Sequence, residues 1–313
     1  MARALTFPGQ GSQAVGMGKA VAEAFGAARE VFAEVDEALS QNLSKLMWNG
    51  PEADLTLTEN AQPAIMATSM AAYRVLEREG GFILGKHAAY VMGHSLGEST
   101  ALCAASALTL ADCARLLKKR GQAMQKAVPV GTGAMAALIG ADRPDVDKLV
   151  AAARQGDVLD IANDNAPGQI VISGSKAAVD RASAMSKEFN VRRAMPLSVS
   201  APFHCALMKP AAEALAEVLD EMTIAPPAVP VIANVTAAPV SDPATIRKLL
   251  VEQVAGMVRW RESVALLPSL DVDTVVEVGA GKVLTGMVKR ISPDLKPFNV
   301  ETPADIDAFL KML

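Results

Sequence analysis

The chain has 313 residues, of which 51% are hydrophobic and 20% are charged, so it can bury a sizeable core and disorder is not expected. Its formal net charge of −4 argues against a general nucleic-acid binder, which needs a basic face to collect phosphates. No apolar run reaches the roughly 18 residues that span a bilayer, and Pro8 and Gly9 interrupt the N-terminal segment before it resembles a signal peptide. Three cysteines without CxxC spacing fit a reducing compartment. We therefore expect a cytoplasmic protein with neither a membrane nor a nucleic acid as partner.

The first part of the chain alternates short apolar runs with longer helical patterns. Buried strands are predicted at 4–7 and 88–92. Helices are predicted, with a break at Gly26 and a cap at Thr58, over residues 18–39, 58–79, 97–107 and 110–128. Because strands that alternate with helices usually lie parallel in one sheet, the pattern predicts an α/β fold with a mostly parallel sheet and helices on both faces.

Residues 129–197 follow a different order of elements. Strands are predicted at 134–139, 159–163, 169–173 and 193–197, and helices at 144–154 and 176–189. This β-α-β-β-α-β order is that of a ferredoxin-like unit. We predict that it is a small domain inserted into a larger, discontinuous domain of residues 1–128 and 198–313. The larger domain resumes with elements expected at 209–222, 229–234, 244–254, 274–278 and 283–291.

The most informative motif is Gly93-His94-Ser95-Leu96-Gly97, a G-x-S-x-G sequence between a predicted strand and a predicted helix. Small neighbours permit a sharp turn, and the serine hydroxyl then lies at a helix N-terminus, where unpaired N–H groups stabilise negative charge. The N–H of Leu96 is therefore a candidate oxyanion donor. A serine that merely caps the helix is the alternative. The flanking strand and helix favour a nucleophile.

A serine nucleophile needs a base, and the chain has three histidines. His204 lies in a proline-containing loop downstream of Ser95, which matches the chain order of hydrolases. His87 is expected at the surface. His94 is expected to support the turn, because side chains one position apart do not face each other on a regular element. His204 is the predicted base.

No acidic residue between the serine and the histidine is a clear third member of a triad. Asp160 and Asp164 are expected in a turn or facing solvent. A backbone carbonyl or an amide could orient His204 instead, since the task is only to fix the tautomer. The glycine pattern Gly9-x-Gly11 loosely matches a dinucleotide fingerprint, but a helical pattern follows it instead of the required second strand. We interpret that segment as a strand-end turn that offers N–H groups to the serine.

These segments together resemble the malonyl-CoA:acyl carrier protein transacylases of fatty-acid synthesis. The similarity extends over nearly the whole chain, through residues 7–13, 62–64, 93–98, 120–121, 165–169, 202–204 and 277–284. It implies a hydrolase-like α/β domain with an inserted ferredoxin-like domain. Ser99 and Ala280 depart from the family pattern, which has an aromatic residue and a proline at these positions.

The resemblance also implies roles for particular residues. Ser95 would be acylated, and His204 would act as its base. The backbone N–H groups of Gln10 and Leu96 would form the oxyanion hole. The backbone carbonyl of the segment at Gln253 would orient His204, which would account for the missing acid.

A second group of residues is implied to bind the substrate. Arg120 would hold the malonyl carboxylate, because a planar guanidinium can bind a carboxylate bidentately. Gln62 would lie nearby, and Phe203 would leave too little space for a methyl branch on the α-carbon of the acyl group. His94 and Asn165 are also expected at the substrate site.

The activity implied by the resemblance is a ping-pong transfer from malonyl-CoA to phosphopantetheinylated acyl carrier protein, by a monomer with no bound cofactor. A serine esterase or thioesterase, a transacylase of a polyketide pathway and a non-catalytic carrier-binding subunit remain alternatives. Because such carriers are acidic, docking is expected near basic residues such as Lys118, Lys187, Arg192 or Arg193.

Overall fold

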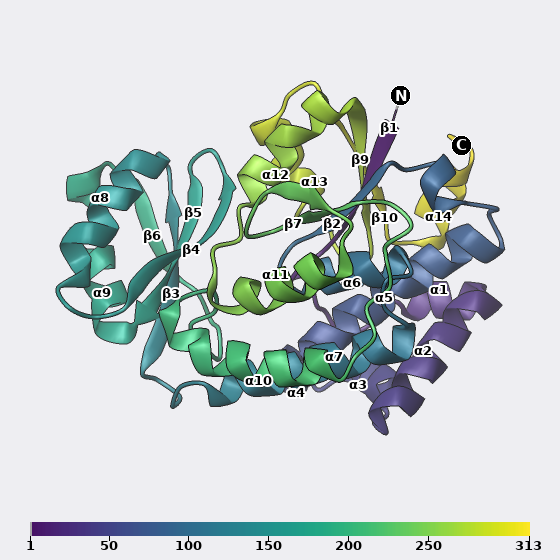
Figure 1. Cartoon of the computed structure of the whole chain (residues 1–313), viewed down its shortest axis with the longest axis horizontal. Coiled ribbons are helices and arrows are strands. Elements are labelled where there is room, and N and C mark those ends of the chain that lie inside the picture. Colours follow the sequence, from purple (N-terminus) through teal and green to yellow (C-terminus); the bar gives the residue numbers. More distant parts are fainter. Residues whose placement is uncertain (1) are drawn as a thin grey trace.

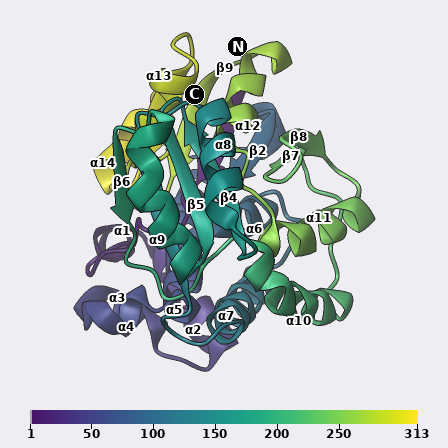
Figure 2. The same ribbon diagram turned by 90° about the vertical axis from the view of Figure 1, so that its left-hand side faces the viewer.

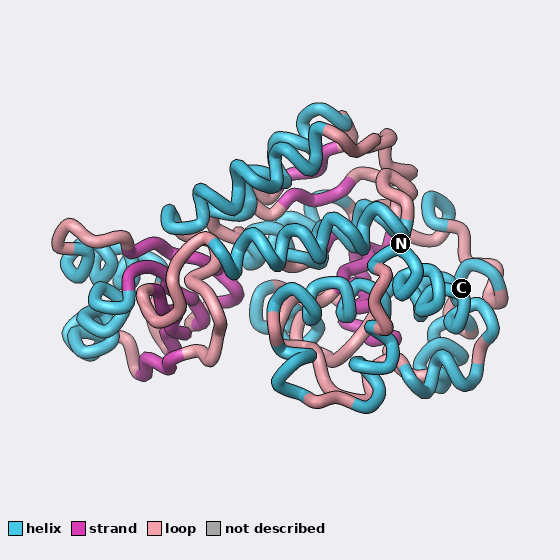
Figure 3. The backbone as a smooth tube through the Cα atoms, turned by 90° about the horizontal axis from the view of Figure 1, so that it is seen from below, coloured by secondary structure: helices cyan, strands magenta, loops and turns pink. Residues whose placement is uncertain are grey.

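The computed structural model describes residues 2–313, which form two sheets with helices around them (Figures 1 and 3). The larger sheet has six strands in the order β10-β9-β1-β2-β7-β8. Its members are β1 (Ala2–Phe7), β2 (Tyr90–Gly93), β7 (Val231–Ala233), β8 (Ala238–Val240), β9 (Val272–Val278) and β10 (Lys296–Val300). All neighbouring strands run parallel except β7 and β8. The predicted α/β class with a mostly parallel sheet is confirmed.

Helices cover both faces of this sheet. The helices are α1 (Lys19–Ala24), α2 (Gly26–Leu39), α3 (Leu43–Asn49), α4 (Glu52–Thr56), α5 (Thr58–Arg78), α6 (Leu96–Ala104), α7 (Leu110–Lys126), α10 (Lys209–Asp220), α11 (Pro243–Ala255), α12 (Trp260–Leu266), α13 (Thr285–Ile291) and α14 (Pro303–Leu310). Short 3₁₀ turns are η1 (Leu84–Lys86), η2 (Ser186–Phe189), η3 (Ala206–Met208) and η4 (Leu267–Leu270). Figure 1 shows α12 and α13 on one side of the sheet and α2, α5, α6 and α7 on the other.

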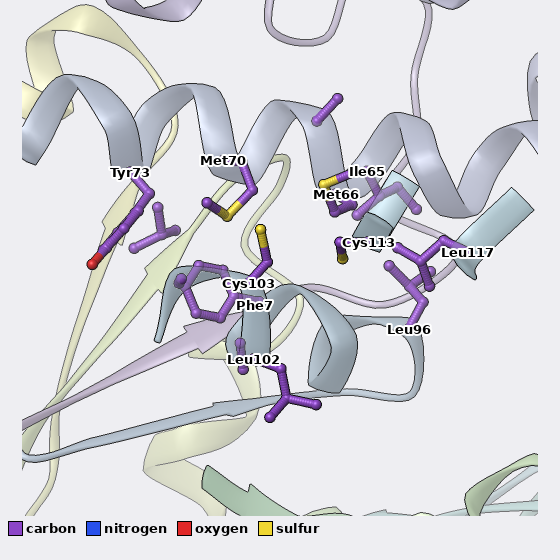
Figure 4. Close-up of a cluster of buried hydrophobic side chains, with 14 of the residues drawn as sticks. Phe7, Ile65, Met66, Met70, Tyr73, Leu96, Leu102, Cys103, Cys113 and Leu117 are labelled. Atoms are coloured by element: carbon purple, nitrogen blue, oxygen red, sulfur yellow. The ribbon is translucent and has the colours of Figure 1, made fainter. Parts of the chain in front are cut away.

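The alternation of side chains along the strands produces these two layers. In β1, Leu5 and Phe7 belong to the hydrophobic cluster under α2, α5 and α7, whereas Ala4 belongs to the cluster under α12 and α13. Figure 4 shows the first cluster, where Met70 and Tyr73 of α5 lie close to Phe7. The sheet is therefore buried on both faces, and its functional groups can reach the outside only at the strand ends.

The second sheet has the order β4-β5-β3-β6, and all its neighbours are antiparallel. Its elements are β3 (Gly133–Ile139), α8 (Arg143–Arg154), β4 (Leu159–Ala166), β5 (Gln169–Ser175), α9 (Lys176–Met185) and β6 (Arg193–Pro196). Figure 2 shows α8 and α9 lying over one face of these strands, where they enclose a separate core. We propose that residues 129–197 are a domain inserted into a discontinuous domain of residues 1–128 and 198–313.

Several sequence-based expectations need correction. Thr58 does not cap α5, because Leu57 occupies the cap position; the Thr58 hydroxyl instead donates a hydrogen bond to the side chain of Gln10. The strand predicted at 159–163 is longer, since β4 continues to Ala166. The patterns did not predict α3, α4, α12, α14, β8 or β10. These elements are short, and β10 is an edge strand that contains Pro297.

The two sheets are joined at one edge of β4. A bridge pairs Asn163 with Val258 of the large-sheet unit, and Val258 exchanges backbone hydrogen bonds with Ala162 and Asp164. The Asp164 carboxylate also lies 2.6 Å from the guanidinium of Arg261. These contacts fix the small sheet beside the carboxyl ends of the parallel strands. Within residues 2–313, no helix has the length and apolar character required to cross a membrane.

Candidate active site

Ser95 lies on the sharp turn between β2 and α6. Its backbone has φ 53° and ψ −110°, a strained conformation for a residue with a side chain. The glycines on either side are required by close backbone contacts. A Cβ on Gly93 would lie 2.0 Å from the carbonyl carbon of Gly97, and a Cβ on Gly97 would lie 2.2 Å from the Phe7 oxygen. The sharpness of the turn therefore requires Gly93, and the packing of β1 against the turn requires Gly97.

The Ser95 hydroxyl faces the imidazole of His204, with Oγ 2.8 Å from Nε2. The other ring nitrogen, Nδ1, lies 2.8 Å from the carbonyl oxygen of Gln253 and 3.1 Å from that of Gly256. Because carbonyl oxygens only accept hydrogen bonds, Nδ1 carries the proton and Nε2 is free to accept one from Ser95. The geometry is that of a nucleophile with its base.

Burial and the nearby charge of Arg120 lower the pKa of His204 to about 3. The imidazole is therefore neutral at neutral pH, which is the state a general base requires. Neither Asp160 nor Asp164 is a hydrogen-bond partner of this histidine. Asp160 accepts a hydrogen bond from the Ala206 N–H, and Asp164 is 0% exposed beside Arg261. The expectation that Asp164 faces solvent or a turn is wrong, because β4 continues through it.

Arg120 reaches the serine from α7. Its Nη2 donates to Ser95 Oγ at 3.1 Å and to Gln253 Oε1 at 2.8 Å, and its Nη1 donates to Gln62 Oε1 at 2.7 Å. Burial lowers the pKa of Arg120 to about 10, so the guanidinium stays charged at neutral pH. The structure thus places a buried cation within hydrogen-bond distance of the nucleophile.

A cavity of about 270 Å³ opens above Ser95. Of the residues predicted at the site, those lining it are Gln10, Gln62, His94, Ser95, Leu96, Arg120, Phe203 and His204. Asn165 and Gln253 do not line it. Asn165 lies behind His94, with its Oδ1 2.8 Å from His94 Nε2, and Gln253 lies behind Arg120 and His204. The small sheet and the segment after it contribute further lining residues: Met135, Asn163, Leu197, Ser198 and Val199.

The first N–H of α6 belongs to Leu96, directly after the serine. The first N–H groups of a helix have no intrahelical acceptor, so this one can bind an oxyanion. Gln10, in the loop after β1, lines the same cavity, and its side chain accepts a hydrogen bond from Thr58. The two predicted oxyanion donors therefore come from the ends of neighbouring parallel strands.

Sequence reasoning missed two buried polar residues at the base of the site. Glu98 follows Ser95 by one helical turn, and Asn234 comes directly after β7. The Asn234 side chain accepts the N–H of Ser95 and donates to the Gly93 carbonyl, and Glu98 accepts the backbone N–H of Asn234. An acidic residue in the first turn of a helix is usual and gives no signal of a site, whereas the position of Asn234 at the carboxyl end of a predicted strand is such a signal.

Comparisons with known proteins show which family this chain resembles. The model of the acyl transferase domain family matches residues 5–302. The malonyl CoA-acyl carrier protein transacylase of Bacillus subtilis is 45% identical over 99% of this chain and 96% of its own length. The protein of that name from Escherichia coli K12 is 44% identical over 99% of both chains.

Solved structures show the same likeness. The acyl-carrier-protein-S-malonyltransferase from Bartonella henselae matches with a TM-score of 0.97 and 52% identity, over 100% of this chain and 99% of that chain. A malonyl-transacylase in complex with its type II PKS acyl-carrier protein matches with a TM-score of 0.96 and 40% identity, over 100% of both chains.

Proposed function

This chain belongs to the malonyl CoA-acyl carrier protein transacylases of the acyl transferase family, and on that basis we propose that Ser95 carries a malonyl group from malonyl-CoA to the thiol of an acyl carrier protein. The observation that carries this proposal is the 2.8 Å contact between Ser95 Oγ and His204 Nε2 beside the buried guanidinium of Arg120. The first two residues supply nucleophile and base, and the third supplies a site for the malonyl carboxylate.

In the first half-reaction, His204 Nε2 takes the hydroxyl proton of Ser95 while Oγ attacks the thioester carbonyl of malonyl-CoA. The N–H groups of Gln10 and Leu96 bind the oxyanion of the tetrahedral intermediate, and loss of one such donor costs about 10²–10³ in rate in other enzymes. The carbon–sulfur bond then breaks. The coenzyme A sulfur takes the proton from His204 and leaves as the thiol.

The second half-reaction reverses these steps with another thiol. The phosphopantetheine thiol of the carrier gives its proton to His204 and attacks the malonyl ester on Ser95. Collapse of the second tetrahedral intermediate breaks the ester bond, and His204 returns the proton to Ser95 Oγ. No cofactor is needed, because each step uses only these two side chains and the backbone donors.

Arg120 makes the site selective for an acyl group with a carboxylate. Its Nη2 lies 3.1 Å from Ser95 Oγ, and the malonyl carboxylate is separated from the reacting carbonyl by a single methylene. The acid and the reacting carbon can therefore occupy the guanidinium and the nucleophile at once. Phe203 lines the cavity beside His204 and restricts the space for a branched acyl chain, although one methyl group is rejected only about 10–200-fold by such pockets.

The carrier protein reaches the site from the mouth of the cavity. Arg192 is exposed directly before β6, Arg193 is exposed as its first residue, and Lys187 is exposed on η2, so they can meet an acidic partner. Lys118 is a weaker candidate, since it is half-buried and its Nζ lies 2.9 Å from Asn60 Oδ1 and 3.5 Å from a Glu59 oxygen. One chain supplies every group of the proposed mechanism, which fits a monomer.

Isotope exchange tests the proposal. Labelled coenzyme A should exchange into malonyl-CoA without any carrier present, because a ping-pong enzyme releases coenzyme A before the acceptor binds. Malonyl transfer should then require the carrier with its phosphopantetheine arm, and the carrier lacking the arm is the control. Release of free malonate without exchange would instead identify a hydrolase. Carriers from fatty-acid and polyketide synthesis should both be tried, since the likeness extends to a polyketide malonyl-transacylase.

A further inference from the structure

A buried carboxylate lies beneath the site without lining its cavity. Glu98 is 3% exposed, and its Oε2 accepts hydrogen bonds from Gln253 Nε2 and from the backbone N–H of Asn234, both at 2.9 Å. We propose that Glu98 is a positioning residue, which acts through Gln253 and Asn234 to hold the nucleophile, the base and the carboxylate-binding arginine in place. This inference rests on the proposed roles of those three groups.

The first connection runs through the side chain of Gln253. Its Nε2 donates to Glu98 and, at 2.9 Å, to the carbonyl oxygen of Ser95. Because a carboxylate only accepts hydrogen bonds, the amide nitrogen must face Glu98, and Oε1 must then face Arg120 Nη2 at 2.8 Å. A reversed amide would point its NH₂ at the guanidinium, donor against donor. Glu98 and the Ser95 carbonyl together therefore keep the amide oxygen facing Arg120, while the Gln253 backbone carbonyl holds His204.

The second connection runs through Asn234. The Asn234 Oδ1 accepts the N–H of Ser95 at 2.8 Å, and its Nδ2 donates to the Gly93 carbonyl at 2.7 Å. The same side chain thus ties the residue before the turn to the nucleophile itself. The strained backbone of Ser95 persists only if its surroundings hold it. The hydrogen bond from the backbone N–H of Asn234 to Glu98 holds Asn234 in the position from which its side chain binds Ser95.

A charge at this position is unfavourable for folding. Burial raises the pKa of Glu98 to about 7, although Asn234, Gln253 and Arg120 oppose the shift. Other titratable groups near it on the elements packed against α6 are Cys113 and His94. Both are neutral at pH 7, because hydrogen bonding and burial raise the pKa of Cys113 and burial lowers that of His94. Arg120 is thus the cation with which the charge of Glu98 interacts. A neutral glutamine at this position would be easier to bury.

This conflict between stability and function provides the test. In the E98Q variant, the new amide can offer NH₂ as well as oxygen, so only the Ser95 carbonyl is left to hold the orientation of Gln253. We expect acyl-enzyme formation from malonyl-CoA to fall about tenfold more than formation from acetyl-CoA, whose acyl group has no carboxylate. In the R120A background, E98Q should not change the ratio of the two rates further.

Thermal stability is a second readout. If Glu98 had only a structural role, E98Q should lower the Tm, whereas our inference predicts a higher Tm. A raised pKa of an acid lowers stability as pH rises from its ordinary value of 4.5 through about 7. The difference between the Tm of E98Q and the Tm of the unmodified chain should therefore increase, in favour of E98Q, as the pH is raised from 5 to 8. A matched control is E277Q. Glu277 is also fully buried, but its oxygens accept the N–H groups of Leu284 and Thr285 at the start of α13, so the rate ratio should stay unchanged.

Two results would overturn the inference. One is an E98Q variant whose malonyl-to-acetyl rate ratio is unaltered, whether or not both rates fall, and the other is a Tm of E98Q below that of the unmodified chain at pH 8. Failure of the proposed function is separate, since the unmodified chain would then form no acyl-enzyme at all.

Discussion

The two sheets of this molecule contribute unequally to the site. The groups proposed to react or to bind the malonyl carboxylate, Ser95, His204 and Arg120, all come from the unit with the parallel sheet. The antiparallel unit contributes cavity wall, including Met135 and Asn163. Parallel strands bring several backbone ends to one edge, where a buried network can hold them, whereas the small sheet only has to cover that edge. The reacting groups and much of the cavity wall thus come from different sheets.

The contrast extends to burial. β2 enters the site through residues that are buried on both sides of the sheet, whereas most residues of β6 are exposed. Changes in the large unit should therefore abolish chemistry, and changes at the joint between the units should chiefly affect stability. The following predictions test that division, from the largest expected effect on catalysis to the smallest.

Replacement of the base should have the largest effect. We expect His204→Ala to slow acyl-enzyme formation by about 10²–10⁴, equally for malonyl-CoA and acetyl-CoA, because proton transfer is common to both. Single-turnover mass spectrometry measures this rate. The control is His87→Ala, which removes a histidine whose Nδ1 accepts the Ile83 N–H outside the site. A normal rate in the His204 variant would show that another group is the base.

Removal of the guanidinium should affect only the charged substrate strongly. Arg120→Ala is expected to lower malonyl loading about 10²-fold while acetyl loading is retained or increased, since a charge-assisted hydrogen bond is lost only in the first case. The rate of malonyl loading in Arg120→Lys should lie between those of the unmodified chain and Arg120→Ala, because an ammonium keeps the charge but cannot bind a carboxylate bidentately. An equal change in the malonyl and acetyl loading rates of Arg120→Ala would contradict the assignment.

The same variant should move the pH dependence of loading. Burial and Arg120 both lower the pKa of His204 to about 3, so removing the cation should raise that pKa. A base loses activity as pH falls through its pKa. The acid limb of acetyl loading should therefore shift to higher pH in Arg120→Ala, as measured by a rate profile over acidic pH. An unmoved limb would argue against the electrostatic coupling.

The joint between the units should give the smallest catalytic effect. Asp164 is fully buried and lies 2.6 Å from Arg261 and 3.6 Å from Arg143, so Asp164→Asn should lower the Tm clearly while the loading rate of the folded protein changes little. Asp147→Asn is the matched control, since Asp147 pairs with Arg143 at the surface and such pairs contribute little. A large loss of activity without a loss of stability would show that the small unit takes part in chemistry.

Much of the fold could be predicted from the sequence, because strongly periodic elements have clear patterns. Strand β1, helix α7 and the chain order of the elements around the small sheet follow from apolar spacing and from turn residues. Several short elements could not be predicted. β10 is an edge strand with a proline, and α3 spans only seven residues, so neither has enough alternation to identify it.

The candidate site divides in the same way. Ser95 and His204 could be identified from local chemistry and chain order, but Arg120 depended on family resemblance, because one arginine on a basic helix resembles an exposed one. Glu98 and Asp164 were missed or misjudged. A buried carboxylate is recognisable only when its partners are known, and those partners lie far away along the chain.

The central claim is that Ser95 carries the malonyl group, and intact-mass spectrometry tests it most directly. The unmodified chain and Ser95→Ala would be mixed briefly with malonyl-CoA, and carrier protein with its phosphopantetheine arm would then be added in excess. The account predicts one malonyl adduct on the unmodified chain, none on Ser95→Ala, and quantitative transfer of the adduct to the carrier thiol. An equal adduct on Ser95→Ala, or an adduct that the carrier cannot remove, would contradict it.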